Sequence, residues 1–170
     1  MIYHREFMIS SCHFNGADIY RAYRELTEPS IQVDELRLIR LQMLAFQVLV
    51  GTHGHNFKIV VEIEDHFEPQ NDYLVDDVLI EALVMQWDNT NLSVHKDFKG
   101  LRATTENVAH LLSRKIMLLL WPSVKARGDI DEFVGPTITV TVHETDQIYA
   151  RAMIDMADEP RQRLEEESAA

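Results

Sequence analysis

Three segments of the chain alternate between apolar and polar residues with a period of two, which is typical of β-strands with one buried face. They run from Glu6 to His13, from Phe57 to Glu64 and from Thr137 to Thr145. The expected inward rows are Phe7, Ile9, Ser11 and His13, then Phe57, Ile59, Val61 and Ile63, then Ile138, Val140 and Val142. Such alternation predicts an antiparallel sheet with one buried and one wetter face.

Helical patterns lie between these strands. A short helix is expected from Asp76 to Trp87, because acidic residues stand at its start, where the helix dipole favours them. A second begins after Thr104 and is expected to end at Trp121-Pro122. Its apolar stripe is Ala109, Leu112, Ile116 and Leu119. Residues Ser30 to Val50 fit a helix, although a period of two fits nearly as well. The order predicts an α+β fold with helices on one face of an antiparallel sheet.

Neither a repeat nor a change of composition marks a domain boundary. The length of 170 residues and the 46% of hydrophobic residues suit one domain with a real core. We therefore expect one domain over residues 1–155 and a polar C-terminal tail over 156–170. The last stretch, from Arg161 onward, is rich in Glu and is expected to be solvated and frayed.

Charge and cysteine content exclude several classes of protein. The net charge of −12 opposes binding to a phosphate backbone, so we expect no nucleic-acid partner. A single cysteine, Cys12, excludes a disulfide framework and a Cys-based structural zinc site, and it is compatible with a reducing cytoplasm. The longest apolar stretch, Leu36 to Val50, is too short and too polar to span a bilayer, and the N-terminus lacks the apolar run of a signal peptide. A cytoplasmic location without membrane association is expected.

Three histidines form the first candidate site. His53 and His55 stand two positions apart at the start of the second strand, so their side chains share a face. His13 ends the inward row of the first strand. Three imidazoles converging from two strands would make a zinc site with a fourth position for water or substrate. The alternative is that all three are ordinary histidines whose hydrogen bonds are satisfied at strand ends.

Glu144 is the second candidate, because it continues an apolar inward row. A buried carboxylate must find hydrogen-bond donors or become protonated. One suitable partner is a flat ring edge with two adjacent N–H groups, as in a pterin or guanine, bound by both oxygens. The alternative is a structural ion pair with Arg151 or Arg102.

Taken together, these motifs resemble the superfamily of 6-pyruvoyl-tetrahydropterin synthase and 6-carboxytetrahydropterin synthase over most of the chain. The resemblance depends on the order of the motifs rather than on any one of them. In chain order they are His13, His53-Gly54-His55-Asn56, Leu74-Val75-Asp76, Trp87-Asp88-Asn89-Thr90-Asn91-Leu92, Thr104-Thr105-Glu106-Asn107-Val108-Ala109 and Val142-His143-Glu144-Thr145.

The resemblance implies a tunnelling fold whose subunits join their sheets into an oligomeric barrel, a trimer or a hexamer. It implies a zinc-dependent lyase acting on 7,8-dihydroneopterin triphosphate, in tetrahydropterin or queuosine biosynthesis. By the same resemblance, His13, His53 and His55 bind Zn²⁺, and Asp88 belongs to the catalytic proton relay. The implied pterin-binding residues are Thr104, Thr105, Glu106 and Glu144.

Two positions depart from the family pattern. The family's proton-abstracting Cys would fall at Leu49 or Gln47, and the His that follows the relay Asp is Asn89 here. None of these side chains takes up a proton, so the proton relay lacks two of its usual members. The residues of the metal and pterin sites, in contrast, are all present. Cys12 and His95 are the candidates to replace the base. A catalytically silent zinc- and pterin- or purine-binding paralogue is the alternative function, and a purely structural ring-forming paralogue is a third.

Overall fold

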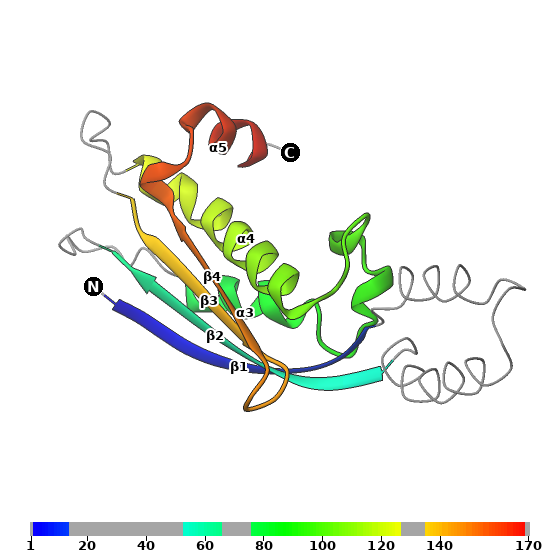
Figure 1. Ribbon diagram of the computed structural model, residues 1–170. Coiled ribbons are helices and arrows are strands. Elements are labelled where there is room, and N and C mark those ends of the chain that lie inside the picture. Colours follow the sequence, from blue (N-terminus) through cyan, green and yellow to red (C-terminus); the bar gives the residue numbers. More distant parts are fainter. Residues whose placement is uncertain (1, 14–52, 66–75, 127–134, 169–170) are drawn as a thin grey trace, which may run out of the picture.

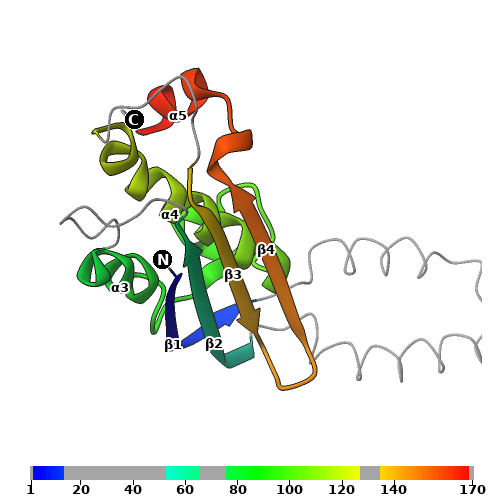
Figure 2. The same ribbon diagram turned by 90° about the vertical axis from the view of Figure 1, so that its left-hand side faces the viewer.

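The computed structural model describes residues 2–13, 53–65, 76–126 and 135–168. Four strands form one antiparallel sheet in the order β1-β2-β3-β4. The strands are β1 (Ile2–His13), β2 (His53–Glu64), β3 (Thr137–His143) and β4 (Tyr149–Asp155). The helices are α3 (Asp77–Met85), α4 (Thr105–Ala126) and α5 (Arg161–Ser168), with 3₁₀ turns at Leu92–Val94, Lys96–Phe98 and Met156–Asp158. Figures 1 and 2 show α3 and α4 on the same face of the sheet. The α+β class with helices on one face is confirmed.

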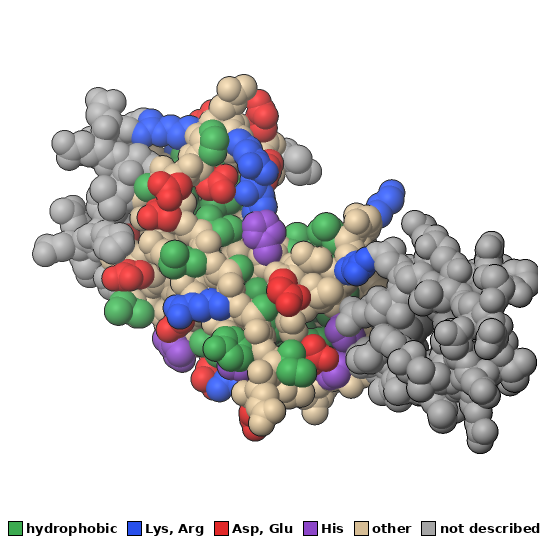
Figure 3. All heavy atoms as spheres, in the orientation of Figure 1, with side chains coloured by type: hydrophobic (Ala, Val, Ile, Leu, Met, Phe, Trp, Pro, Cys, Tyr) green, Lys and Arg blue, Asp and Glu red, His purple; other side chains and the backbone are tan. Residues whose placement is uncertain are grey.

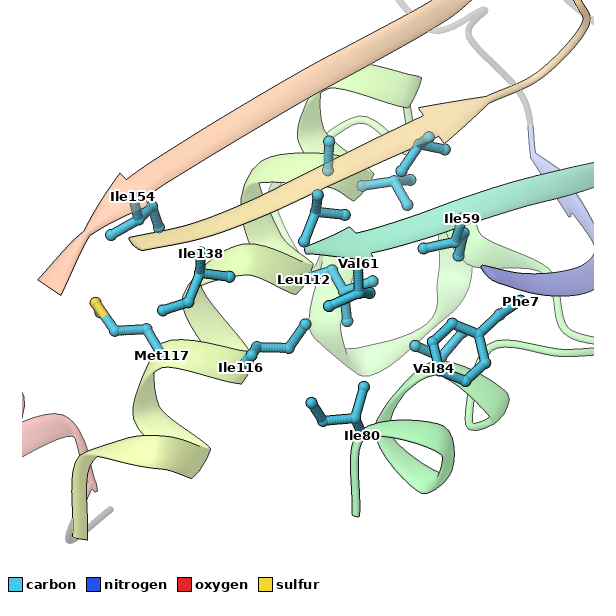
Figure 4. Close-up of a cluster of buried hydrophobic side chains, with 14 of the residues drawn as sticks. Phe7, Ile59, Val61, Ile80, Val84, Leu112, Ile116, Met117, Ile138 and Ile154 are labelled. Atoms are coloured by element: carbon cyan, nitrogen blue, oxygen red, sulfur yellow. The ribbon is translucent and has the colours of Figure 1, made fainter. Parts of the chain in front are cut away.

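The core lies between the inward rows of the strands and the helices α3 and α4 (Figure 4). The inward residues of all three expected strands are buried, and the row of β1 includes Ser11 and His13. Apolar side chains of α3 and α4 cover these rows, among them Ile80, Val84, Leu112 and Ile116. Period-two patterning therefore places His13 on the inner face with the core.

Helix boundaries follow local chemistry. Asp76 caps α3, since its side chain accepts hydrogen bonds from the amides of Val78 and Leu79. The expectation that Trp121-Pro122 ends the second helix is wrong, because α4 continues to Ala126 with Pro122 inside it. Proline removes one helical hydrogen bond, but Trp121 and Val124 on either side are buried, and this packing holds the last turn. Of the expected apolar stripe, Ala109, Leu112 and Ile116 are buried, whereas Leu119 is only partly buried.

Two elements were not foreseen. In β4 the large apolar residues Tyr149 and Met153 point outward and are exposed, so the pattern does not mark a buried strand. The end of the chain was expected to be a frayed tail, but residues 161–168 form α5, whose Leu164 is buried.

On the face seen in Figure 3, acidic, basic and apolar side chains are interspersed. The expected segment from Ser30 to Val50, with Leu49 and Gln47, lies outside the described residues.

No helix in the described part of the chain combines the length and apolar character needed to cross a membrane.

Candidate metal and ligand site

His13 is fixed by the backbone that precedes α4. Its side chain is 1% exposed, and Nδ1 contacts the carbonyl oxygen of Ala103. Because a carbonyl only accepts, Nδ1 is the nitrogen that donates in this contact, and Nε2 is the ring nitrogen on the side of Glu144. A backbone acceptor on the second ring nitrogen is the usual support of a metal-binding histidine.

Sheet register brings the second histidine motif to the same place. In the antiparallel pairing of β1 with β2, His13 stands opposite His53 and Ser11 stands opposite His55. The rings of His13 and His55 are nearly perpendicular, with centroids 5.1 Å apart. The side chain of His53 lies outside the described residues; its backbone is in β2, in the same inward row as His55.

Glu144 approaches the two rings on the same face of the sheet, from the end of β3, which pairs with β2. It begins the turn between β3 and β4, where its amide donates a 2.9 Å hydrogen bond to the carbonyl of Ile148. Oε1 of Glu144 lies 2.9 Å from Nε2 of His55 and 4.0 Å from Nε2 of His13. The alternative partner Arg151 lies elsewhere, 3.6 Å from Glu62.

These donors could hold a metal ion. One ligand atom each from His13, His55 and Glu144 lies within 4.8 Å of the others. Imidazole nitrogens with a carboxylate oxygen are a usual donor set for zinc. The residues present therefore fit the metal that the resemblance implied.

The expected pterin-binding segment starts α4. The Thr104 hydroxyl accepts a 3.4 Å hydrogen bond from the amide of Asn107, and Thr105 is buried. Glu106 is exposed, and its own backbone amide, followed by the hydroxyls of Thr104 and Thr105, lowers the pKa of its carboxyl. This carboxylate is thus turned back onto the helix N-terminus. The segment connects to the metal site through its neighbour Ala103, which contacts His13.

Asp88 is held by β1 and by Asn89. Oδ1 accepts a 2.7 Å hydrogen bond from the amide of Ser10, and Oδ2 accepts a 2.8 Å bond from Nδ2 of Asn89. Asn89 has a positive φ of 54° and its amide bonds the carbonyl of Ser10. Asp88 is not in the His13, His55 and Glu144 group. The carboxylate of Asp88 thereby connects residues 88–89 to β1, the strand that ends at His13.

The two candidate replacement bases make contacts of their own. Cys12 has the opposite parity to His13, as expected, and its thiol lies 3.7 Å from the carbonyl of Thr90. Nδ1 of His95 accepts a 3.3 Å hydrogen bond from the amide of Asp97. Neither residue belongs to the group of possible metal donors found among the described residues.

Sequence reasoning missed two contacts at this site. The carbonyl of Ala103 is a backbone group, and no side-chain pattern could reveal it. The approach of Glu144 to His55 was also missed, although the inward parity of both residues was a signal for it.

The sequence model of the family described as 6-pyruvoyl tetrahydropterin synthase matches residues 45–154, more than half of the chain. The chain belongs to this family. The matched range holds His53, His55 and Glu144, while His13 precedes it.

Solved 6-pyruvoyl tetrahydropterin synthase structures support the fold. That of Caenorhabditis elegans has a TM-score of 0.50 and 17% identity, covering 91% of this chain and 96% of that chain. The Plasmodium vivax structure has a TM-score of 0.51 and 13% identity, covering 91% and 99%. The Plasmodium falciparum structure has a TM-score of 0.52 and 11% identity, covering 91% and 98%. Comparison with curated proteins gives no sequence match. The tunnelling fold of the synthase family is therefore confirmed for this chain.

Proposed function

We propose that this protein is a zinc-dependent pterin synthase-like lyase that acts on 7,8-dihydroneopterin triphosphate or a close relative. The observation that carries the proposal is the convergence of His13, His55 and Glu144, whose donor atoms lie within 4.8 Å of one another. In this proposal His13, His53 and His55 hold the zinc. Bound there, zinc lowers the pKa of a coordinated hydroxyl, which makes removal of a nearby proton feasible at neutral pH.

The chain's own residues have distinct roles in this proposal. Ala103 orients the ring of His13 through its carbonyl. Glu144 accepts N–H groups of the pterin ring, and Thr104, Thr105 and Glu106 support that ring from the start of α4. Asp88 is the remaining member of the proton relay.

A second candidate function is a catalytically silent zinc- and pterin-binding protein. The contact between Asn89 and Asp88 favours it, because an amide donates to the carboxylate at the position where the family has a titrating histidine. Without that histidine, Asp88 has no side-chain partner at this position able to pass on a proton.

Turnover distinguishes the two functions. Zinc-loaded protein would be incubated with 7,8-dihydroneopterin triphosphate, and the products followed by mass spectrometry. Release of triphosphate with formation of a new pterin supports the lyase. Binding of the substrate without any product supports the silent protein, and absence of both zinc and pterin binding contradicts both.

We further propose a homo-oligomer, a trimer or hexamer, in the cytoplasm. The sheet order leaves β1 and β4 as open edges within the described part of the chain. Closure of such edges against copies of the same sheet removes unpaired backbone groups.

A further inference from the structure

The carboxylate of Glu144 lies beside the two imidazoles and is also the group expected to bind the pterin ring. Recognition of two adjacent ring N–H groups uses both oxygens of a carboxylate. Oε1 of Glu144, however, already lies 2.9 Å from Nε2 of His55 and 4.0 Å from Nε2 of His13. The oxygen that faces the imidazoles is therefore one of the two that a pterin ring would require.

The surroundings of this oxygen favour a cation. The side chains of His13, His55 and Glu144 are 1%, 20% and 17% exposed, so water has limited access to the group. The contact of His13 with Ala103 engages Nδ1, and the other ring nitrogen, Nε2, lies 4.0 Å from the Glu144 oxygen. Imidazole nitrogens and a carboxylate oxygen gathered with little access to water are the donors that a zinc ion takes as ligands.

The distances agree with this interpretation. Zinc bonds of about 2.0–2.2 Å to nitrogen and oxygen place neighbouring donors of a tetrahedral site about 3.3 Å apart. The two separations from Oε1, 2.9 Å and 4.0 Å, lie on either side of that value. The ligand atoms of all three residues lie within 4.8 Å of one another.

We propose that Glu144 is a shared carboxylate, which ligates the metal in the ligand-free protein and transfers to the ring N–H groups when a pterin binds. This inference rests on the metal site of the proposed function. It adds a role for Glu144 that the pterin-anchoring assignment does not contain.

A shared carboxylate couples the two ligands. A pterin that lacks a side chain at ring position 6 offers the metal no hydroxyl to replace the lost oxygen. Binding of the metal and binding of unsubstituted pterin are then negatively coupled. By linkage, each lowers the affinity for the other by the same factor. Coupling between two sites is commonly about 5- to 150-fold in affinity.

The test measures both affinities on the full chain. Unsubstituted pterin is titrated into zinc-free and zinc-loaded protein, and zinc is titrated with and without pterin against a chromophoric chelator. We expect pterin to bind at least about fivefold more weakly when zinc is present. Cobalt substituted for zinc gives a second readout, because loss of a carboxylate ligand changes its visible absorption.

Variants separate ligation from other roles. Glu144→Gln is expected to weaken zinc binding at least about tenfold and to change the cobalt spectrum. It should also abolish the negative coupling between zinc and pterin binding. Glu144→Asp retains the charge with a shorter reach, and we expect an intermediate zinc affinity. Asp146→Asn changes an exposed carboxylate of the same turn and should leave zinc affinity unchanged. Circular dichroism establishes that each variant is folded, and Glu144→Asp carries the test if Glu144→Gln does not fold.

The outcomes distinguish this inference from the proposed function. Unchanged zinc affinity in folded Glu144→Gln and Glu144→Asp, or pterin affinity independent of zinc in the natural protein, would overturn the shared carboxylate and leave the zinc site standing. Failure of the natural protein to bind zinc would overturn the proposed metal site itself, and the inference with it.

Discussion

The indole Nε1–H of Trp87 donates a 3.0 Å hydrogen bond to Oδ2 of Asp97, and the ammonium of Lys115 lies 2.9 Å from the same oxygen. Trp87 is fully buried, and the side chain of Asp97 is 9% exposed. Asp97 thus links the turn that follows α3 to α4. The same turn supports β1 just before His13, since the carbonyl of Thr90 accepts a 3.0 Å hydrogen bond from the amide of Cys12.

Replacing Asp97 with Asn should lower the free energy of unfolding by about 1.5–3 kcal/mol, the range for hydrogen bonds to charged groups. The amide oxygen can still accept from Trp87, but it loses the charge that pairs with Lys115. Urea unfolding measures the change. Lys115→Met removes the ammonium instead, and an equal loss in the two variants would assign the effect to the ion pair.

The pH dependence of this contribution has a definite sign. Burial alone would raise the pKa of the Asp97 carboxyl, but hydrogen bonds from Lys115 and Trp87 and the charge of Lys115 hold it below its ordinary value of 3.8. A carboxyl with a lowered pKa stabilises the fold above its unfolded pKa and loses that contribution as the pH falls. Below about pH 4, the stability of the natural protein should therefore fall more steeply than that of Asp97→Asn. Parallel acid unfolding curves would contradict this account.

Zinc binding is expected at about one ion per chain, measured by elemental analysis of purified protein. His13→Ala, His53→Ala and His55→Ala should each abolish it, because the site then keeps only two of the three histidines that hold the ion. His4→Ala is the matched control, since His4 is half exposed on the outer parity of β1 and should not affect the metal content. Zinc-free protein after incubation with the metal would disprove the site.

Turnover of 7,8-dihydroneopterin triphosphate should be slow while pterin affinity is ordinary. General-base assistance is typically worth about a hundred- to ten-thousand-fold in rate, and Asn89 cannot provide it. Steady-state kinetics combined with equilibrium binding measures both quantities. A rate typical of an intact relay would show that another group is the base, with Cys12 and His95 as the first residues to replace by Ala.

Helix α5 should contribute to stability through Leu164. This side chain is buried, while Arg114 of α4 holds Glu167 at 2.7 Å and Lys125 holds Glu165 at 2.7 Å. Leu164→Ala should cost about 2–5 kcal/mol by chemical unfolding, as for other buried leucines. Gln162→Ala, on the exposed side of the same helix, should change stability by less than about 0.5 kcal/mol. Equal effects would show that α5 does not depend on this contact.

Self-association should give a solution mass several times 19.7 kDa by light scattering. The expectation follows from the open edges of β1 and β4 in the described sheet. A single monomeric species across a range of protein concentrations would contradict a ring of subunits.

The sequence alone predicted those features that depend only on the local geometry of the backbone. Alternation along a strand places every second side chain on one face, so the inward position of His13 and His55 followed from the sequence. The start of the helix near Asp76 is equally local: acidic residues indicated it, and the structure adds that the Asp76 carboxylate accepts hydrogen bonds from the amides of Val78 and Leu79. The order of short motifs also identified the family, which the match over residues 45–154 confirmed.

Only the tertiary structure decided which inward residues meet. The distance between His55 and Glu144 depends on the register of β2 with β3 and on the turn that follows β3, and neither is encoded by periodicity. The contact of His13 with Ala103 depends on where the chain enters α4. The burial of Leu164 depends on the neighbouring surface of α4, so a segment that is polar by composition becomes a docked helix. Such contacts arise from packing between segments distant along the chain, whereas periodicity records only the environment of each segment by itself.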